Sequence, residues 1–117
     1  MKQGRHEIAV CTYQNRVCPR FDLSHEILIY DSEVPENGPV EKIDATALSP
    51  EGCFRILVKR EVQVVIVGGI QDRYQAMFLD HRIKVIWGVI GEVNDVIAAY
   101  IRDTLYPDIG RVSDQWP

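Results

Sequence analysis

Apolar positions along the first half of the chain predict three strands and few helical turns. The ranges 7–13 and 26–31 are apolar on both faces, which predicts two buried strands separated by an irregular segment at 14–24. Two prolines and a glycine within 35–39 predict a turn. The range 40–46 is therefore expected to return beside the second strand as a third strand.

Helical and strand patterns alternate through the second half of the chain. Ser49 can cap a helix and Pro50 suits its first position, and the apolar face of this helix extends to Val62. The apolar run 63–67 predicts another strand buried on both faces. A helical stripe follows and ends near His81.

A last strand and helix complete the predicted fold. We expect the strand at 83–87, and a helix from Glu92 to Leu105 because its apolar residues recur at helical spacing. Right-handed crossovers make the fourth and fifth strands parallel to the first, and the hairpin makes the second antiparallel. The prediction is an α/β fold with three layers, whose five-stranded mixed sheet has the order 3-2-1-4-5.

The glycine pair that follows the fourth strand marks the expected binding site. In open α/β sheets, ligands bind beyond the carboxyl ends of the strands, where the chain winds away in both directions. Gly68 and Gly69 should therefore face the segment 14–24 across a crevice. Glycine lets a ligand approach the backbone closely, and the free N–H groups of the next helix favour an anion. The sequence thus predicts a negatively charged ligand.

Length, composition and charge predict the number of domains and argue against some classes of partner. A chain of 117 residues that is 46% hydrophobic suits one domain, 1–117, with its core in 7–105. The tail 106–117 lacks periodicity and is expected to be flexible or to dock on a partner. A net charge of −4 without a basic run argues against nucleic acid as a partner. No apolar signal region or membrane-length run is present, so we predict a cytoplasmic protein without a membrane partner.

The three cysteines have different expected roles. They contain no Cys-x-x-Cys pair, which argues against a disulfide framework and against a structural zinc site. Cys11 and Cys53 fall in apolar patterns and are expected in the core. Cys18 stands between Arg16 and Arg20, and nearby cations stabilise the thiolate that binds soft metals. Cys18 is a candidate metal ligand, and an ordinary small loop residue is the alternative.

One histidine and three arginines are further candidates. His25 begins the second strand and becomes a second metal ligand if its side chain points toward Cys18. Arg16, Arg20 and Arg73 can donate hydrogen bonds to an anionic cluster, or they can be ordinary solvated arginines. Arg73 is expected in a first helical turn, where the helix dipole opposes a cation, so another interaction should hold it there.

Six segments in combination resemble the dinitrogenase iron-molybdenum cofactor biosynthesis family. They are 8–10, 15–22, 29–31, 65–70, 83–86 and 91–93. The resemblance runs from Ile8 to Leu105 and implies a ribonuclease H-like fold. It also implies binding of an iron-sulfur or molybdenum-containing cluster or its precursor, as in NifX- and NafY-type members and a domain of NifB.

One motif departs from the family pattern. Many members carry His-Phe-Gly-Arg in the first loop, with the histidine as a cluster ligand, whereas this chain has Arg20-Phe21-Asp22-Leu23. The histidine ligand cannot be carried over to this chain. With Pro19 in front, the loop looks like that of a branch whose motif is Pro-x-Phe-Asp.

The favoured hypothesis is a non-enzymatic carrier of an anionic iron-sulfur or molybdenum-iron-sulfur cluster. Its predicted cofactor contacts are Arg16, Cys18, Arg20, Gly68, Gly69 and Arg73, with Cys18 and His25 as metal ligands. The resemblance implies a cofactor-assembly protein as partner, and a homodimer is one way to complete so small a ligand set. The alternative is a ligand-free regulatory or protein-interaction domain of the same fold, which the absent histidine favours. An enzyme ranks last, because a two-metal nuclease needs several converging carboxylates and the strand ends offer only Asp31.

Overall fold

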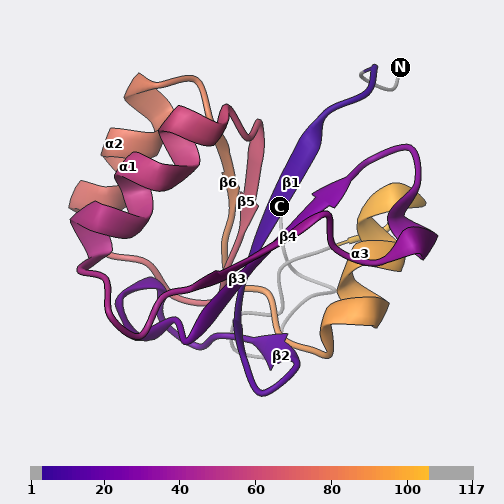
Figure 1. Ribbon diagram of the computed structural model, residues 1–117, viewed down its shortest axis with the longest axis horizontal. Coiled ribbons are helices and arrows are strands. Elements are labelled where there is room, and N and C mark those ends of the chain that lie inside the picture. Colours follow the sequence, from indigo (N-terminus) through magenta and orange to yellow (C-terminus); the bar gives the residue numbers. More distant parts are fainter. Residues whose placement is uncertain (1–3, 106–117) are drawn as a thin grey trace, which may run out of the picture.

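A mixed sheet forms the centre of the computed structural model, which describes residues 4–105 (Figure 1). Its main path runs β4-β3-β1-β5-β6. These strands are β1 (Glu7–Tyr13), β3 (Glu26–Asp31), β4 (Glu41–Asp44), β5 (Val64–Ile66) and β6 (Lys84–Ile86). β5 lies parallel to β1 and β6 lies parallel to β5, whereas β3 is antiparallel to both β1 and β4. The predicted order 3-2-1-4-5 is confirmed.

A sixth strand was not predicted. β2 (Arg16–Val17) pairs antiparallel with the end of β1 and lies off the main path of the sheet. Between them, Gln14 and Asn15 have φ of 53° and 67°, as in a tight hairpin turn. Two residues are too few to show an alternating pattern, which is why the sequence indicated only an irregular segment there.

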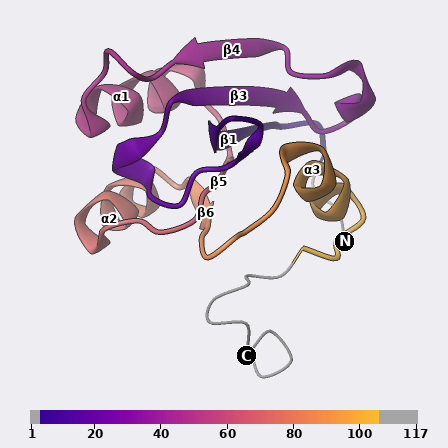
Figure 2. The same ribbon diagram turned by 90° about the horizontal axis from the view of Figure 1, so that it is seen from below.

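Helices cover both faces of the sheet. α1 (Pro50–Arg60) and α2 (Asp72–Asp80) pack on one face, and α3 (Val93–Ile101) packs on the other (Figures 1 and 2). α1 begins as predicted, because the Ser49 hydroxyl accepts a hydrogen bond of 3.0 Å from the N–H of Gly52. The three-layer, ribonuclease H-like α/β arrangement is therefore confirmed.

The third helix is shorter than predicted. It ends at Ile101 instead of continuing to Leu105. Asp103 has a φ of 65°, a left-handed conformation that terminates a right-handed helix. Apolar spacing alone does not reveal such a residue, so the sequence overestimated the length of the helix.

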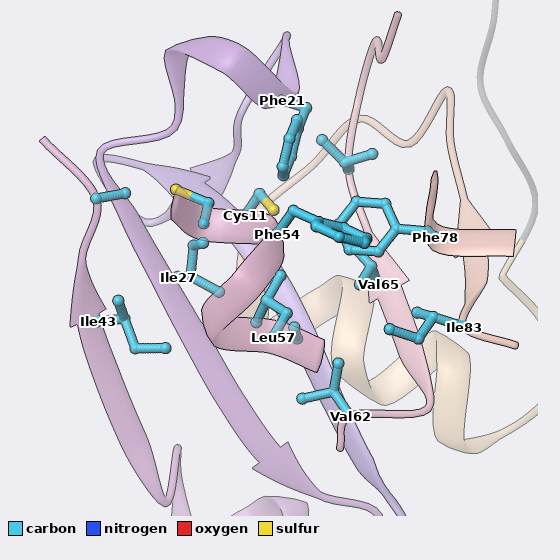
Figure 3. Close-up of a cluster of buried hydrophobic side chains, with 14 of the residues drawn as sticks. Cys11, Phe21, Ile27, Ile43, Phe54, Leu57, Val62, Val65, Phe78 and Ile83 are labelled. Carbon is cyan, nitrogen blue, oxygen red and sulfur yellow. The ribbon is translucent and has the colours of Figure 1, made fainter. Parts of the chain in front are cut away.

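Two hydrophobic clusters hold the layers together. On the side of α1 and α2, Phe78 packs edge-on against Phe54 at 5.1 Å between ring centroids and against Phe21 at 5.5 Å (Figure 3). On the other side, the apolar face of α3 packs on alternate residues of β1. Ala9 and Cys11 face the first cluster, and Ile8 and Val10 face the second. This explains why β1 is apolar on both faces.

Two predictions concern features beyond this architecture. Among residues 4–105, no helix is both long and apolar enough to cross a membrane. The cytoplasmic location stays a prediction. The prediction of a flexible or docking tail at 106–117 lies outside the described residues.

Candidate functional site

The loop 18–22 lies against the turn that follows β5, at the carboxyl ends of the central strands. Arg20 and Gly69 form a parallel β-bridge, and the N–H of Gly68 donates a hydrogen bond of 3.0 Å to the Cys18 carbonyl. The two segments are thus brought together as the strand order predicts. We call the surface made by this loop and the turn the carboxyl-edge rim.

The glycine pair is required by the loop itself. A β-carbon on Gly68 would lie 2.6 Å from the carbonyl oxygen of Cys18 and 2.8 Å from that of Pro19. The N–H of Gly69 donates to the Pro19 carbonyl. Both glycine N–H groups are therefore bonded to the loop, which occupies the predicted crevice, and an anion site at the N–H groups of the next helix stays a prediction. A contact between Gly68 or Gly69 and a cluster stays a prediction.

Cys18 is more buried than its polar neighbours indicate. Cys18 is 1% exposed, and its Sγ donates a hydrogen bond of 3.0 Å to the Arg20 carbonyl. Phe21 is also buried, so the loop points these two side chains inward while Pro19 and Arg20 face solvent. The Cys18 sulfur can reach an external metal only if the loop moves. Its role as a ligand stays a prediction.

The other two cysteines lie in the core, as predicted. Burial raises the pKa of the Cys11 thiol to about 12, and burial also raises the pKa of Cys53. Both are therefore protonated thiols at neutral pH, a form that does not ligate metals.

Asp22 ties the rim together. Its carboxylate accepts hydrogen bonds from Nε and Nη2 of Arg20 at 3.0 and 2.9 Å, and from Nε2 of Gln71 at 3.1 Å. Within residues 4–105, the buried Oε1 of Gln71 is the only buried side-chain polar atom without a hydrogen-bond partner. No sequence pattern singled out Gln71, which lies at the start of α2 and contacts the candidate loop through Asp22.

The other two candidate arginines belong to different parts of the surface. Arg73 pairs with Glu51 at 3.2 Å and lies 4.5 Å over the ring of Tyr74, which supplies the interaction expected to hold a cation in that first turn. Arg16 lies 4.0 Å from Glu92, at the start of α3. The three arginines therefore do not converge on one point.

His25 lies on the surface beside Tyr13, with 4.2 Å between the ring centroids. Across residues 4–105, no group of three or more histidine, cysteine, aspartate or glutamate side chains is placed to hold a metal ion. The residues present do not form a closed metal site. A cluster at this edge would be cargo with few protein ligands.

Comparison with known families shows which family the chain belongs to. The family described as dinitrogenase iron-molybdenum cofactor matches residues 6–103. The chain belongs to this family. No curated protein matches it closely enough to add a more specific assignment.

Solved structures share the fold at low sequence identity. The crystal structure of PH0822 is similar with a TM-score of 0.79 and 23% identity, covering 91% of this chain and 97% of that one. A Methanocaldococcus jannaschii protein assigned as a dinitrogenase has a TM-score of 0.68 and 16% identity, covering 88% and 94%. A Thermotoga protein assigned as NifB has a TM-score of 0.66 and 21% identity, covering 88% and 93%. These likenesses establish the fold.

Proposed function

We propose that this chain binds and carries an anionic metal–sulfur cluster, iron-sulfur or molybdenum-containing, or a precursor of one, and catalyses no reaction itself. The observation that carries the proposal is the family match over residues 6–103. The carboxyl-edge rim is the site we favour, because ligands of open α/β sheets bind where the strand order reverses.

Arg20 is the main proposed contact with the cluster. Its side chain is 56% exposed, and Asp22 holds the guanidinium in one orientation through two hydrogen bonds. A guanidinium has five N–H donors, so several remain available for cluster sulfides. Arg16 and Arg73 remain proposed contacts that add positive charge from other parts of the surface.

Cys18 and His25 are the proposed metal ligands. His25 is exposed in the structure, whereas Cys18 becomes available when the loop 18–22 opens. Gly68 and Gly69 then present backbone N–H groups that the closed loop occupies. One thiol and one imidazole suit temporary carriage of a cluster rather than permanent ligation.

Because the chain offers only two proposed metal ligands, we also propose partners for it. A second copy of the chain would double the ligand set, so a homodimer is part of the proposal. Large apolar side chains are exposed at or after the carboxyl ends of several strands, and they suit docking of a cofactor-assembly protein. These side chains are Tyr13, Leu23, Trp87 and Ile90.

The closed loop favours a second candidate function. With Cys18 in the core and both glycine N–H groups bonded, the same fold can act as a ligand-free regulatory or protein-interaction domain. The two functions differ in whether the purified chain takes up a cluster at all.

Anaerobic reconstitution with iron and sulfide separates the two functions. We expect the parent chain to gain visible absorption, and Arg20→Gln to bind the cluster more weakly. Lys59→Gln is the matched control, because it removes one exposed positive charge at the opposite edge of the sheet. Equal losses in both variants would point to net charge alone, and no absorption in the parent would favour the interaction domain.

A further inference from the structure

A groove runs along one flank of α3, on the opposite face of the sheet from α1 and α2. It consists of two adjoining cavities of about 490 and about 440 Å³, both lined by Tyr30 and Asn94. The connection between β3 and β4, with the short helix η2 (Pro35–Asn37), forms the other side (Figures 1 and 2). Each volume is in the range of small-molecule sites.

Tyr30 is a buried polar residue that opens into this groove. The residue is 3% exposed, but its hydroxyl oxygen is accessible from the groove and makes no hydrogen bond to another residue within 4–105. Burial raises the pKa of this hydroxyl, so it is protonated and able to donate. A hydroxyl at the junction of the two cavities, with no partner among these residues, is available to donate to a ligand in the groove.

The larger cavity contains charges of both signs. Arg16 and Glu92 face each other at 4.0 Å on one side of it. Lys42 on β4 and Glu26 on β3 also line it, and among residues 4–105 neither forms an ion pair. One unpaired cation and one unpaired anion in the same cavity suit a ligand that carries both charges.

The smaller cavity is mainly apolar. Ile97, Ala98 and Ile101 of α3 form one wall, and Pro35 of the β3–β4 connection faces them. A short hydrocarbon group is the natural occupant of such a surface. The groove is thus charged at the start of α3 and apolar toward its end.

We infer that this groove binds a small zwitterion of the amino-acid class with an apolar side chain. Its carboxylate pairs with Lys42 and accepts the Tyr30 hydroxyl, and its ammonium group pairs with Glu26. Its side chain occupies the apolar cavity beside Ala98. This inference does not depend on cluster carriage, because Tyr30, Lys42 and Glu26 are not among the proposed cluster contacts, although Arg16 lines the groove and is one of them.

Chemical shifts of the full chain test the inference. L-Leucine or L-phenylalanine at millimolar concentration should shift amide signals of Tyr30, Lys42 and Asn94. Tyr30→Phe should weaken binding about tenfold, because it removes one hydrogen bond to a charged group. Ala98→Phe should abolish the effect by filling the apolar cavity, and Tyr13→Phe, at an exposed tyrosine outside the groove, should leave it unchanged.

Two control ligands make the result decisive. Hexanoate lacks the ammonium group, and glycine lacks the apolar side chain, so both should bind more weakly than leucine. Equal binding of hexanoate and leucine would overturn the zwitterion assignment. Absence of shifts in the groove with either apolar amino acid, or a Tyr30→Phe variant that binds as tightly as the parent, would overturn the site.

Discussion

A β-carbon on Gly68 would lie 2.6 Å from the carbonyl oxygen of Cys18. The turn after β5 and the loop 18–22 are therefore in backbone contact, and the hydrogen bond from the N–H of Gly68 fixes their spacing. Real side chains do not tolerate such an approach, so glycine at this position keeps the loop closed over the strand ends. The candidate site and the stability of the fold consequently depend on the same contact.

Gly68→Ala should destabilise the protein. The added methyl group meets backbone atoms that cannot rotate away, and overpacking of this kind costs about 1–3 kcal/mol in free energy of unfolding. Urea denaturation of both proteins measures the difference. Gly4→Ala is the control, because a β-carbon there meets nothing within 4 Å. Equal stabilities of Gly68→Ala and Gly4→Ala would contradict the close contact.

Asp22→Ala should cost more stability than Arg20→Gln. Removing the carboxylate leaves both Arg20 and the partly buried amide of Gln71 without their acceptor, a loss of about 1–3 kcal/mol. Arg20→Gln removes an exposed ion pair and should cost less than about 1 kcal/mol. Thermal unfolding of the two variants tests the order. A larger loss in Arg20→Gln would show that Asp22 does not tether the loop.

Acid should weaken the contribution of Asp31 to stability. Hydrogen bonds from Arg5 and from the N–H of Glu33 hold the pKa of Asp31 below its ordinary value. In the unfolded chain, this carboxyl has the ordinary aspartate pKa of about 4. The stabilisation by Asp31 is therefore complete above that pH, and it is lost as pH falls through the lower pKa of the folded state.

The difference in unfolding free energy between the parent and Asp31→Asn should therefore shrink as pH falls from about 6 to about 3. Urea denaturation at several pH values measures it. Asp95→Asn, at an exposed position of α3, serves as the control. A difference that stays constant over this range would mean that the folded pKa of Asp31 is not lowered.

The three cysteines should react slowly with iodoacetamide in the native protein. Cys11, Cys18 and Cys53 are all buried, and the raised pKa of Cys11 removes its thiolate at working pH. Cys11 lies inside the central strand, so it should be modified last, whereas Cys18 becomes accessible when the loop at the rim opens. Mass spectrometry of digested samples gives the order. Early modification of Cys11 would contradict this arrangement.

The sequence predicted the fold well because the fold depends on patterns that span many residues. The runs at 7–13 and 63–67 are apolar on both faces, and that requirement alone indicates helices on both sides of the sheet. Crossover handedness then determined the strand order. The two-residue β2 was missed, since so short a strand carries no periodicity.

The candidate site was harder to predict because it depends on short contacts. The sequence correctly placed the loop 18–22 beside the glycine pair. It did not reveal that the loop occupies the expected crevice, in direct backbone contact with the glycines. Flanking arginines suggested a solvent-facing Cys18, whereas packing beside Phe21 turns the thiol inward. Side-chain direction within an irregular loop has no sequence period from which it could be inferred.

Cluster carriage is tested most directly by iron, molybdenum and sulfide analysis of the chain purified without oxygen, together with its visible absorption. We expect a coloured protein with a stoichiometric metal–sulfur cluster. The Cys18→Ala variant should contain little or none of this cluster, whereas Cys53→Ala should retain it. A colourless, metal-free parent that also fails to take up iron and sulfide on reconstitution would contradict cluster carriage.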